Sequence, residues 1–232
     1  MITTPDPIPF DPDLLLTTLR TELRAAWARL QSDHGAEGLY GFGIYTTSEL
    51  SYLNVTAFSN AGLDKVTERY VTATEHFKGK DRTLIHESLR WSPCDSPLHE
   101  IGCEMLPETA KLIQCLDPAL EENQELSGDD EDDDDFDDEW WDPRVLKSFD
   151  LCIQALQEMD AEGLFGTGEM RESFVLCLWK GDQSNIERYE HAKKLNPASV
   201  TKRFGEQLNA GIRAHYKAMY PGKRPPKNDV FE

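Results

Sequence analysis

The chain has 232 residues, of which 39% are hydrophobic, enough for a buried core in one large domain or two small ones. Its 43 acidic and 24 basic residues give a formal net charge of −19, which argues against nucleic acid as a partner. No apolar stretch approaches the roughly 20 residues that span a bilayer, and residues 1–13 lack the basic and apolar regions of a secretory signal. We therefore expect a cytoplasmic protein with no membrane partner.

The first third of the chain predicts a helix followed by a β-hairpin. Asp11 and Pro12 are typical of a helix start, and the leucines behind them recur every three or four residues, so we expect an amphipathic helix that ends near Gly35. Residues 39–45 and 50–57 are rich in aromatic and β-branched side chains and are separated by the polar sequence TTSE. They predict the two strands of a hairpin.

The middle of the chain predicts a helix, a strand and two more helical pieces. An apolar pattern over residues 63–77 predicts a helix that stops at residues 78–79. Residues 83–91 predict a third strand, which is ended by the prolines behind it. Residues 98–116 are helical in character, and Pro107 predicts a break between two pieces.

The last third predicts another helix and a buried strand. Asp142 and Pro143 repeat the signal for a helix start, and apolar residues at helical spacing follow over residues 146–156. The glycines of residues 163–169, GLFGTGE, predict a turn. Residues 173–179, SFVLCLW, show no polar alternation, which predicts a central strand buried on both faces.

These elements together predict an α+β fold. Ser184 predicts the cap of a short helix, and the Asn-Pro pair at residues 196–197 precedes the last long one. We expect a single domain over residues 1–232, with about four mostly antiparallel strands packed with several helices. Because helices flank it on both sides, the acidic segment 121–141 is interpreted as a loop inserted between two helices, and residues 221–232 as a carboxyl-terminal tail.

The acidic segment carries the most informative feature of the chain. Ten of the eleven residues 129–139 are acidic, and two tryptophans follow at once. If extended, this run would stretch over roughly 36 Å with a carboxylate about every 3.4 Å, close to the phosphate spacing of a nucleic-acid strand. Runs of like charge are commonly solvated loops. Aromatic side chains beside charge, however, are typical of binding surfaces.

We therefore predict that this run binds a protein partner with a basic surface. The predicted partner-binding residues are Asp129, Asp130, Glu131, Asp132, Asp133, Asp134, Asp135, Phe136, Asp137, Asp138, Glu139, Trp140 and Trp141.

The sequence predicts no metal site and no cofactor. Cys94, His99, Cys103 and Cys115 could in principle hold zinc, but they lack the tight Cys-x-x-Cys spacing of structural zinc sites. An odd count of five cysteines without framework spacing favours scattered, buried and reduced thiols, as in cytoplasmic proteins. The glycine-rich segments match no phosphate-binding loop.

No residue pattern assembles a convincing active site, so we expect no enzyme. His86 and His99 are each followed by a glutamate, but neither belongs to the HExxH pattern of zinc proteases. Trp91 lies in a turn, where a tryptophan more often fills the core than carries a ligand. A pocket formed by Trp91, His86 and His99 is the enzymatic alternative.

Four segments give the chain a family resemblance. They read LYGFGIYTTSELSYLNVTAFSN, RWSPCDSP, ALQEMDAEGLFGTGEMRESFVLCLWKGD and LNPASVTKRF. In this order, over residues 14–204, the chain resembles the bacterial family catalogued as domain of unknown function 4303. Cys94 departs from the small residue expected in the RWSP turn, and the run 129–139 looks like an addition. The resemblance implies no catalytic residues. It implies a genomic context, since members of such families are often encoded next to toxins.

Three hypotheses follow from the sequence. The first is an immunity protein that neutralises a cognate bacterial toxin by occluding its basic active-site or substrate groove. The second is a cytoplasmic scaffold or regulator that catalyses no reaction and whose acidic loop is merely solvated. The third is an enzyme of unrecognised type. The absence of a catalytic pattern and the implied context favour the immunity protein.

Overall fold

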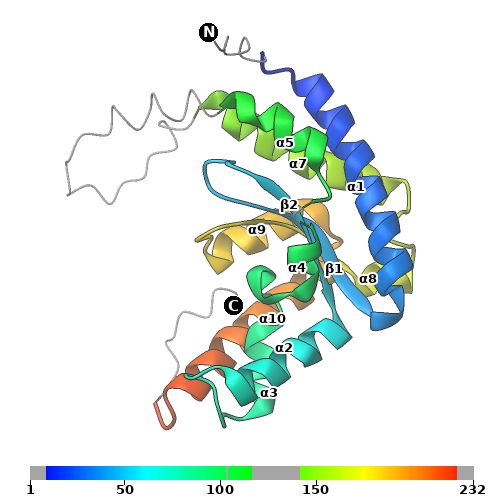
Figure 1. Ribbon diagram of the computed structural model, residues 1–232. Helices are drawn as coiled ribbons and strands as arrows, with labels where there is room; N and C mark the ends of the chain where they lie inside the picture. The colour runs from blue at the N-terminus through cyan, green and yellow to red at the C-terminus, as the bar shows by residue number, and fades with distance from the viewer. Residues whose placement is uncertain (1–8, 103, 117–141, 224–232) are drawn as a thin grey trace, which may run out of the picture.

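A three-stranded mixed sheet lies between two groups of helices (Figure 1). The computed structural model describes residues 9–102, 104–116 and 142–223. Strand β1 (Leu39–Thr46) is central; β2 (Leu53–Ser59) pairs with it antiparallel, and β3 (Val175–Lys180) pairs with it parallel. The α+β class and the hairpin are confirmed. The expected four mostly antiparallel strands are wrong for the described residues, where one of the two strand pairs is parallel.

The strand expected over residues 83–91 is instead helix α3 (Arg82–Leu89). The Asp81 side chain accepts hydrogen bonds from the amides of Thr83 and Leu84, at 2.8 and 3.4 Å, and so caps the helix. Ile85 and Leu89, four residues apart, are buried together on one face. The helical spacing of these two side chains therefore outweighs the β-branched character of the segment.

Strand β3 is buried as expected, but it lies at the edge of the described sheet rather than at its centre. Side chains satisfy its outer backbone groups. The Asn196 side-chain amide accepts from the Leu176 amide at 2.8 Å and donates to the Leu176 carbonyl at 2.6 Å. The Gln183 side chain accepts from the Lys180 amide at 3.2 Å. Covering an edge in this way removes a template for unwanted strand pairing.

Three helices cover one face of the sheet: α1 (Pro12–His34), α5 (Pro107–Ile113) and α7 (Pro143–Ala161). The alternate side chains Phe42, Ile44, Leu176 and Leu178 join them in the larger hydrophobic core. Helices α1 and α7 begin at the predicted caps, Asp11 and Asp142.

The other face carries α2 (Asn60–Ala73), α3, α9 (Asn185–Leu195) and α10 (Ala198–Met219). The Ser184 cap of α9 and the start of α10 just after Pro197 are confirmed. Helix α2 ends at Ala73, before the predicted residues 78–79, because hydrogen-bonded turns take over from Thr74. Phe77 still packs against Tyr70 at 5.1 Å, so the apolar pattern extends beyond the helix.

Short helical segments complete the described fold. Helix α4 (Pro97–Gly102) is separated from α5, which confirms the break at Pro107, although the proline starts the second piece instead of interrupting it. Helix α8 (Glu169–Ser173) follows the predicted glycine turn, where Gly163, Gly166 and Gly168 have positive φ. Three 3₁₀ turns cover Gly35–Glu37, Pro93–Asp95 and Gln114–Leu116. Within the described ranges, no helix has the length and apolar character needed to cross a membrane.

Candidate functional site

A cleft of about 300 Å³ opens between α3, α9 and α10, and we call it the α10 cleft. The close approach of α3 and α10 depends on Gly211, since a Cβ at this position would lie 3.2 Å from the Glu87 carbonyl oxygen. The lining combines aromatic rings with polar groups from all three helices and the turn behind α3. It includes Ser88, Trp91, Asn185, Arg188, Gln207 and His215.

Trp91 forms one wall of this cleft and is only 5% exposed. Its ring contacts Tyr40, Phe58 and Phe204 edge to face, with centroids 5.0 to 5.2 Å apart. The indole Nε1 donates to Gln207 Oε1 at 3.1 Å. The predicted core role of Trp91 is therefore confirmed, and the same residue also holds the Gln207 amide in place.

The two glycines of the YGFGIY segment make room for tryptophans. A Cβ at Gly41 would lie 2.9 Å from the Trp91 ring, and a Cβ at Gly43 would lie 2.7 Å from the Trp179 ring and 1.8 Å from the Cys177 carbonyl oxygen. Trp179 is fully buried, and its Nε1 has no hydrogen-bond partner among the described residues. The segments YGFGIY and RWSP, which carry the family resemblance, are thus in contact at Trp91, which lines the α10 cleft.

Arg188 brings an unbalanced charge to the α10 cleft. Its guanidinium Nε is shielded from solvent and makes no hydrogen bond within the described part of the chain. Its Nη1 makes one long contact, 3.4 Å to Asn185 Oδ1. The neighbouring carboxylate of Glu187 is held by Lys180 at 3.2 Å and by the Ser184 amide at 2.8 Å. Burial lowers the pKa of the Arg188 guanidinium, because desolvation penalises the charged form.

A second cavity of about 130 Å³ shares Trp91 and Gln207 with the α10 cleft. Arg90 and Arg203 line it. Arg90 lies 3.6 Å from the Glu87 carboxylate, and Arg203 Nη1 donates to the Glu172 carbonyl. Basic side chains therefore stand on both sides of the Trp91–Gln207 pair.

The structure separates the residues of the enzymatic alternative. His86 Nε2 lies 3.8 Å from Asp64, and burial lowers the pKa of this histidine. The His99 ring packs edge to face on Tyr45 at 4.9 Å. Neither histidine lines the two cavities of the described residues that Trp91 lines here, the α10 cleft and the second cavity. The sequence-based pocket of these three residues is therefore not assembled.

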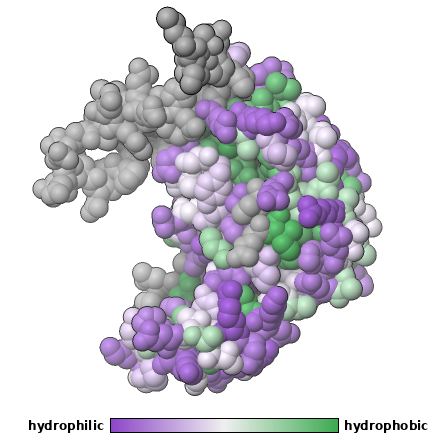
Figure 2. Space-filling model, in the orientation of Figure 1, coloured by the Kyte–Doolittle hydropathy of each residue, from purple (hydrophilic) through white to green (hydrophobic). Residues whose placement is uncertain are grey.

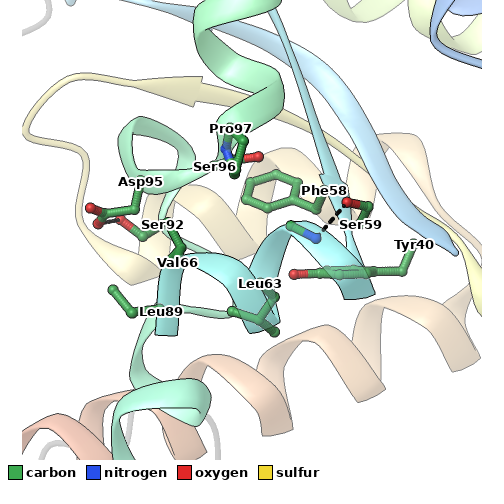
Figure 3. A pocket seen from close by; sticks show the side chains of 11 residues that line it. Tyr40, Phe58, Ser59, Leu63, Val66, Leu89, Ser92, Asp95, Ser96 and Pro97 are labelled. Carbon is green, nitrogen blue, oxygen red and sulfur yellow. Dashed lines mark hydrogen bonds between the residues drawn. The ribbon is translucent and has the colours of Figure 1, made fainter. Parts of the chain in front are cut away.

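The turn behind Trp91 encloses a much smaller space, shown in Figure 3. Phe58, Leu63 and Val66 surround it, and its volume of about 10 Å³ holds at most one water molecule. Asp95 lies at its rim and accepts from Ser92 Oγ at 2.6 Å and from the Tyr70 hydroxyl at 2.5 Å. This carboxylate orders the turn, since each of its oxygens accepts a hydrogen bond from a hydroxyl.

The predicted partner-binding residues 129–141, and the loop 121–141 that contains them, lie outside the described residues. The described chain on each side is firmly packed. Leu116 is fully buried before the segment. After it, Asp142 is 9% exposed, and Arg144 donates to both of its carboxylate oxygens, at 2.6 to 3.1 Å. The hydrogen bonds from Arg144 lower the pKa of Asp142 despite its burial.

The described cysteines are scattered. Cys152 and Cys177 are buried, as predicted, and burial raises the pKa of the Cys152 thiol to about 12. Cys94 is exposed, which corrects the expectation of buried thiols, because it lies in the 3₁₀ turn at the surface. Cys103 and the Cys115 side chain lie outside the description. Within it, no three His, Cys, Asp or Glu side chains are placed to hold a metal ion.

No sequence pattern singles out Arg188 or Gln207. Both lie on amphipathic helices, where a polar residue is ordinarily solvent-facing. Only the crossing of α3, α9 and α10 turns them toward one cleft.

Comparisons with known proteins identify the family. A family model described as "Domain of unknown function (DUF4303)" matches residues 19–197. No curated protein and no solved structure matches the chain. Because the family model covers most of the sequence, the chain belongs to the DUF4303 family.

Proposed function

We propose that the protein is a cytoplasmic immunity protein that binds and neutralises a cognate bacterial toxin by occluding a basic active-site or substrate groove, without catalysing a reaction itself. One observation carries the proposal. Residues 117–141 contain 14 of the 43 acidic residues and none of the 24 basic residues, so this segment holds −14 of the net charge of −19.

The packing of the flanking chain supports this proposal. The segment leaves the described body after the buried Leu116 and returns at the buried cap Asp142. The rest of the chain carries only −5 of the net charge, so the negative charge is concentrated in this one segment. Charge concentrated in this way steers a basic partner toward one side of the molecule and accelerates association.

The face of the described body in Figure 2 shows no single large apolar patch. Figure 2 shows mainly polar residues on this face, with small apolar patches between them. The large exposed apolar side chains, such as Leu146, Met170 and Ile186, come from different helices. In our proposal, Phe136, Trp140 and Trp141 supply the apolar contact beside the acidic run.

The experiment starts from the product of the neighbouring gene as the candidate toxin. We expect co-purification with the full chain, rescue of toxicity in cells, and an association rate that falls steeply with added salt. Replacing the ten acidic residues of 129–139 by Asn or Gln should slow association by about tenfold or more. A matched variant with Phe136, Trp140 and Trp141 changed to Ser keeps the charge and should instead accelerate dissociation.

The outcomes test the immunity function and the role of the acidic run separately. Failure to capture or rescue with any neighbouring gene product would contradict the immunity function. Full affinity and unchanged rates in both variants would leave the function intact but assign the contact to another surface, with the acidic run acting only as a solvated loop.

A further inference from the structure

We propose that the α10 cleft binds a small molecule that carries one carboxylate or phosphate group, with Arg188 holding the anionic group and Trp91 supporting a planar apolar part. This inference does not depend on the immunity function, because it concerns a different part of the chain and a different class of ligand.

The charge of Arg188 is the first argument. Arg188 is half-buried with its Nε shielded from solvent, and a guanidinium that loses part of its hydration is costly unless hydrogen bonds or an opposite charge compensate it. Arg188 has one long contact to Asn185, and no described carboxylate lies within ion-pair distance of it. Glu87 is the carboxylate that lines the cleft, and it lies beside Arg90 at 3.6 Å. An anion entering the cleft would supply the missing partner.

The arrangement of the donors is the second argument. Arg188 Nη1 makes a long contact of 3.4 Å to Asn185 Oδ1, and Trp91 donates to the Gln207 oxygen. The Gln207 amide nitrogen is thereby left as a donor in the lining shared by both cavities. A donor that is already oriented, as Gln207 is by Trp91, loses little entropy on binding. Arg188 and Gln207 line the same cleft, and a guanidinium and an amide donor can together hold one carboxylate or phosphate group.

The size and the walls of the cleft are the third argument. Its volume of about 300 Å³ is at the lower end of ligand pockets, which suits a molecule with a single ring. Trp91 and Tyr216 contribute aromatic walls, and Leu208 and Ile212 contribute aliphatic ones. Apolar walls with a few oriented polar groups are typical of a small-molecule site. The overall charge of −19 opposes non-specific binding of anions, so binding here would require a built site.

The test uses four probes with the full chain: phenyl phosphate, benzoate, inorganic phosphate and neutral benzamide. Titration calorimetry and ¹H–¹⁵N NMR should show phenyl phosphate or benzoate binding with a Kd of about 1 mM, as expected for a ligand of this size. Which of the two binds more tightly identifies the anionic group. Inorganic phosphate and benzamide should each bind at least about tenfold more weakly, because each lacks one half of the recognised chemistry.

Two arginine variants assign the site. Arg188→Met should weaken the binding by about ten- to a hundredfold, since charge-assisted hydrogen bonds are lost. Arg213→Met removes an exposed guanidinium from α10 and should leave the affinity unchanged. The proposal is overturned if no anionic probe binds, if benzamide binds as tightly as benzoate, or if both variants weaken binding equally.

The thermal midpoint shows whether Arg188 serves the ligand or the fold. Replacing a half-buried charge that has no ion-pair partner among the described residues with an apolar chain of similar length should leave Tm unchanged or raise it. A lowered Tm with unchanged probe binding would make Arg188 a structural residue and overturn the proposal. If Arg188→Met does not fold, Arg188→Lys decides the question: it keeps the charge but loses the planar fork, and about tenfold weaker binding is expected.

Discussion

Two arginines beside strand β3 have opposite surroundings. Arg171 in α8 is 7% exposed and forms an ion pair with Asp160 at 2.6 Å. It also donates to the carbonyls of Phe174 and Leu195, at 2.8 and 2.9 Å, and to Asn196 Oδ1 at 3.2 Å. We call this group the α8 junction. Within the described residues, the guanidinium of Arg188 in the α10 cleft makes one hydrogen bond, of 3.4 Å. A guanidinium saturated by fixed acceptors holds the fold together, whereas an unsaturated one beside a cleft is available to a ligand.

The largest effect is expected at the α8 junction. Arg171→Met removes one partner of a buried ion pair and leaves the acceptors of two chain segments unsatisfied, so unfolding should become easier by about 3–5 kcal/mol. Urea denaturation measures this loss. Arg188→Met in the same assay should change the free energy of unfolding by less than about 1 kcal/mol. If both variants lost the same free energy of unfolding, the distinction between a structural Arg171 and a ligand-binding Arg188 would be wrong.

A middle-sized effect is expected inside the α10 cleft. Gln207→Leu leaves the buried Trp91 Nε1 without its acceptor, which should cost about 1–3 kcal/mol. The matched control is Gln154→Leu on α7, which loses a hydrogen bond to Glu158 within one helix and should cost less than about 0.5 kcal/mol. A Gln207 variant as stable as this control would show that solvent replaces the acceptor and that the cleft is more open than the contacts of Trp91 indicate.

The smallest effect is a pH dependence of stability that comes from His191, on the same helix as Arg188. His191 lies on α9 with its ring Nδ1 3.0 Å from the Leu178 carbonyl oxygen, and burial lowers the pKa of this histidine, with Lys180 and Lys194 acting in the same direction. The unfolded chain then binds the proton first as the pH falls. Stability is therefore fully present above about pH 6.5 and declines below it, toward the lower pKa of the folded state.

Urea denaturation between about pH 7.5 and about pH 5.5 measures this decline. His191→Asn should make it shallower. His86, whose pKa is also lowered by burial, retains part of the slope. A slope unchanged by His191→Asn would assign the dependence to other groups.

Local sequence patterns predicted much of the fold because the spacing of apolar residues indicates whether a single segment is a helix or a strand. The caps Asp11, Asp142 and Ser184 mark the helix starts that the structure confirms. Residues 83–91 show the limit of this reasoning, since a short apolar segment fits either period until its partners are known. The position of β3 could not be predicted for the same reason. An edge strand covered by Asn196 and Gln183 has the same apolar sequence as a central strand.

The sequence by itself determined the hairpin, the helices other than α3 and α8, the burial of β3, the core role of Trp91 and the concentration of negative charge in residues 117–141. All of these depend on local spacing or on composition. Tertiary structure alone decided the parallel pairing of β3 with β1 and the different surroundings of Arg171 and Arg188. An arginine has the same five donors at every position, and its role depends on which acceptors distant segments bring to it.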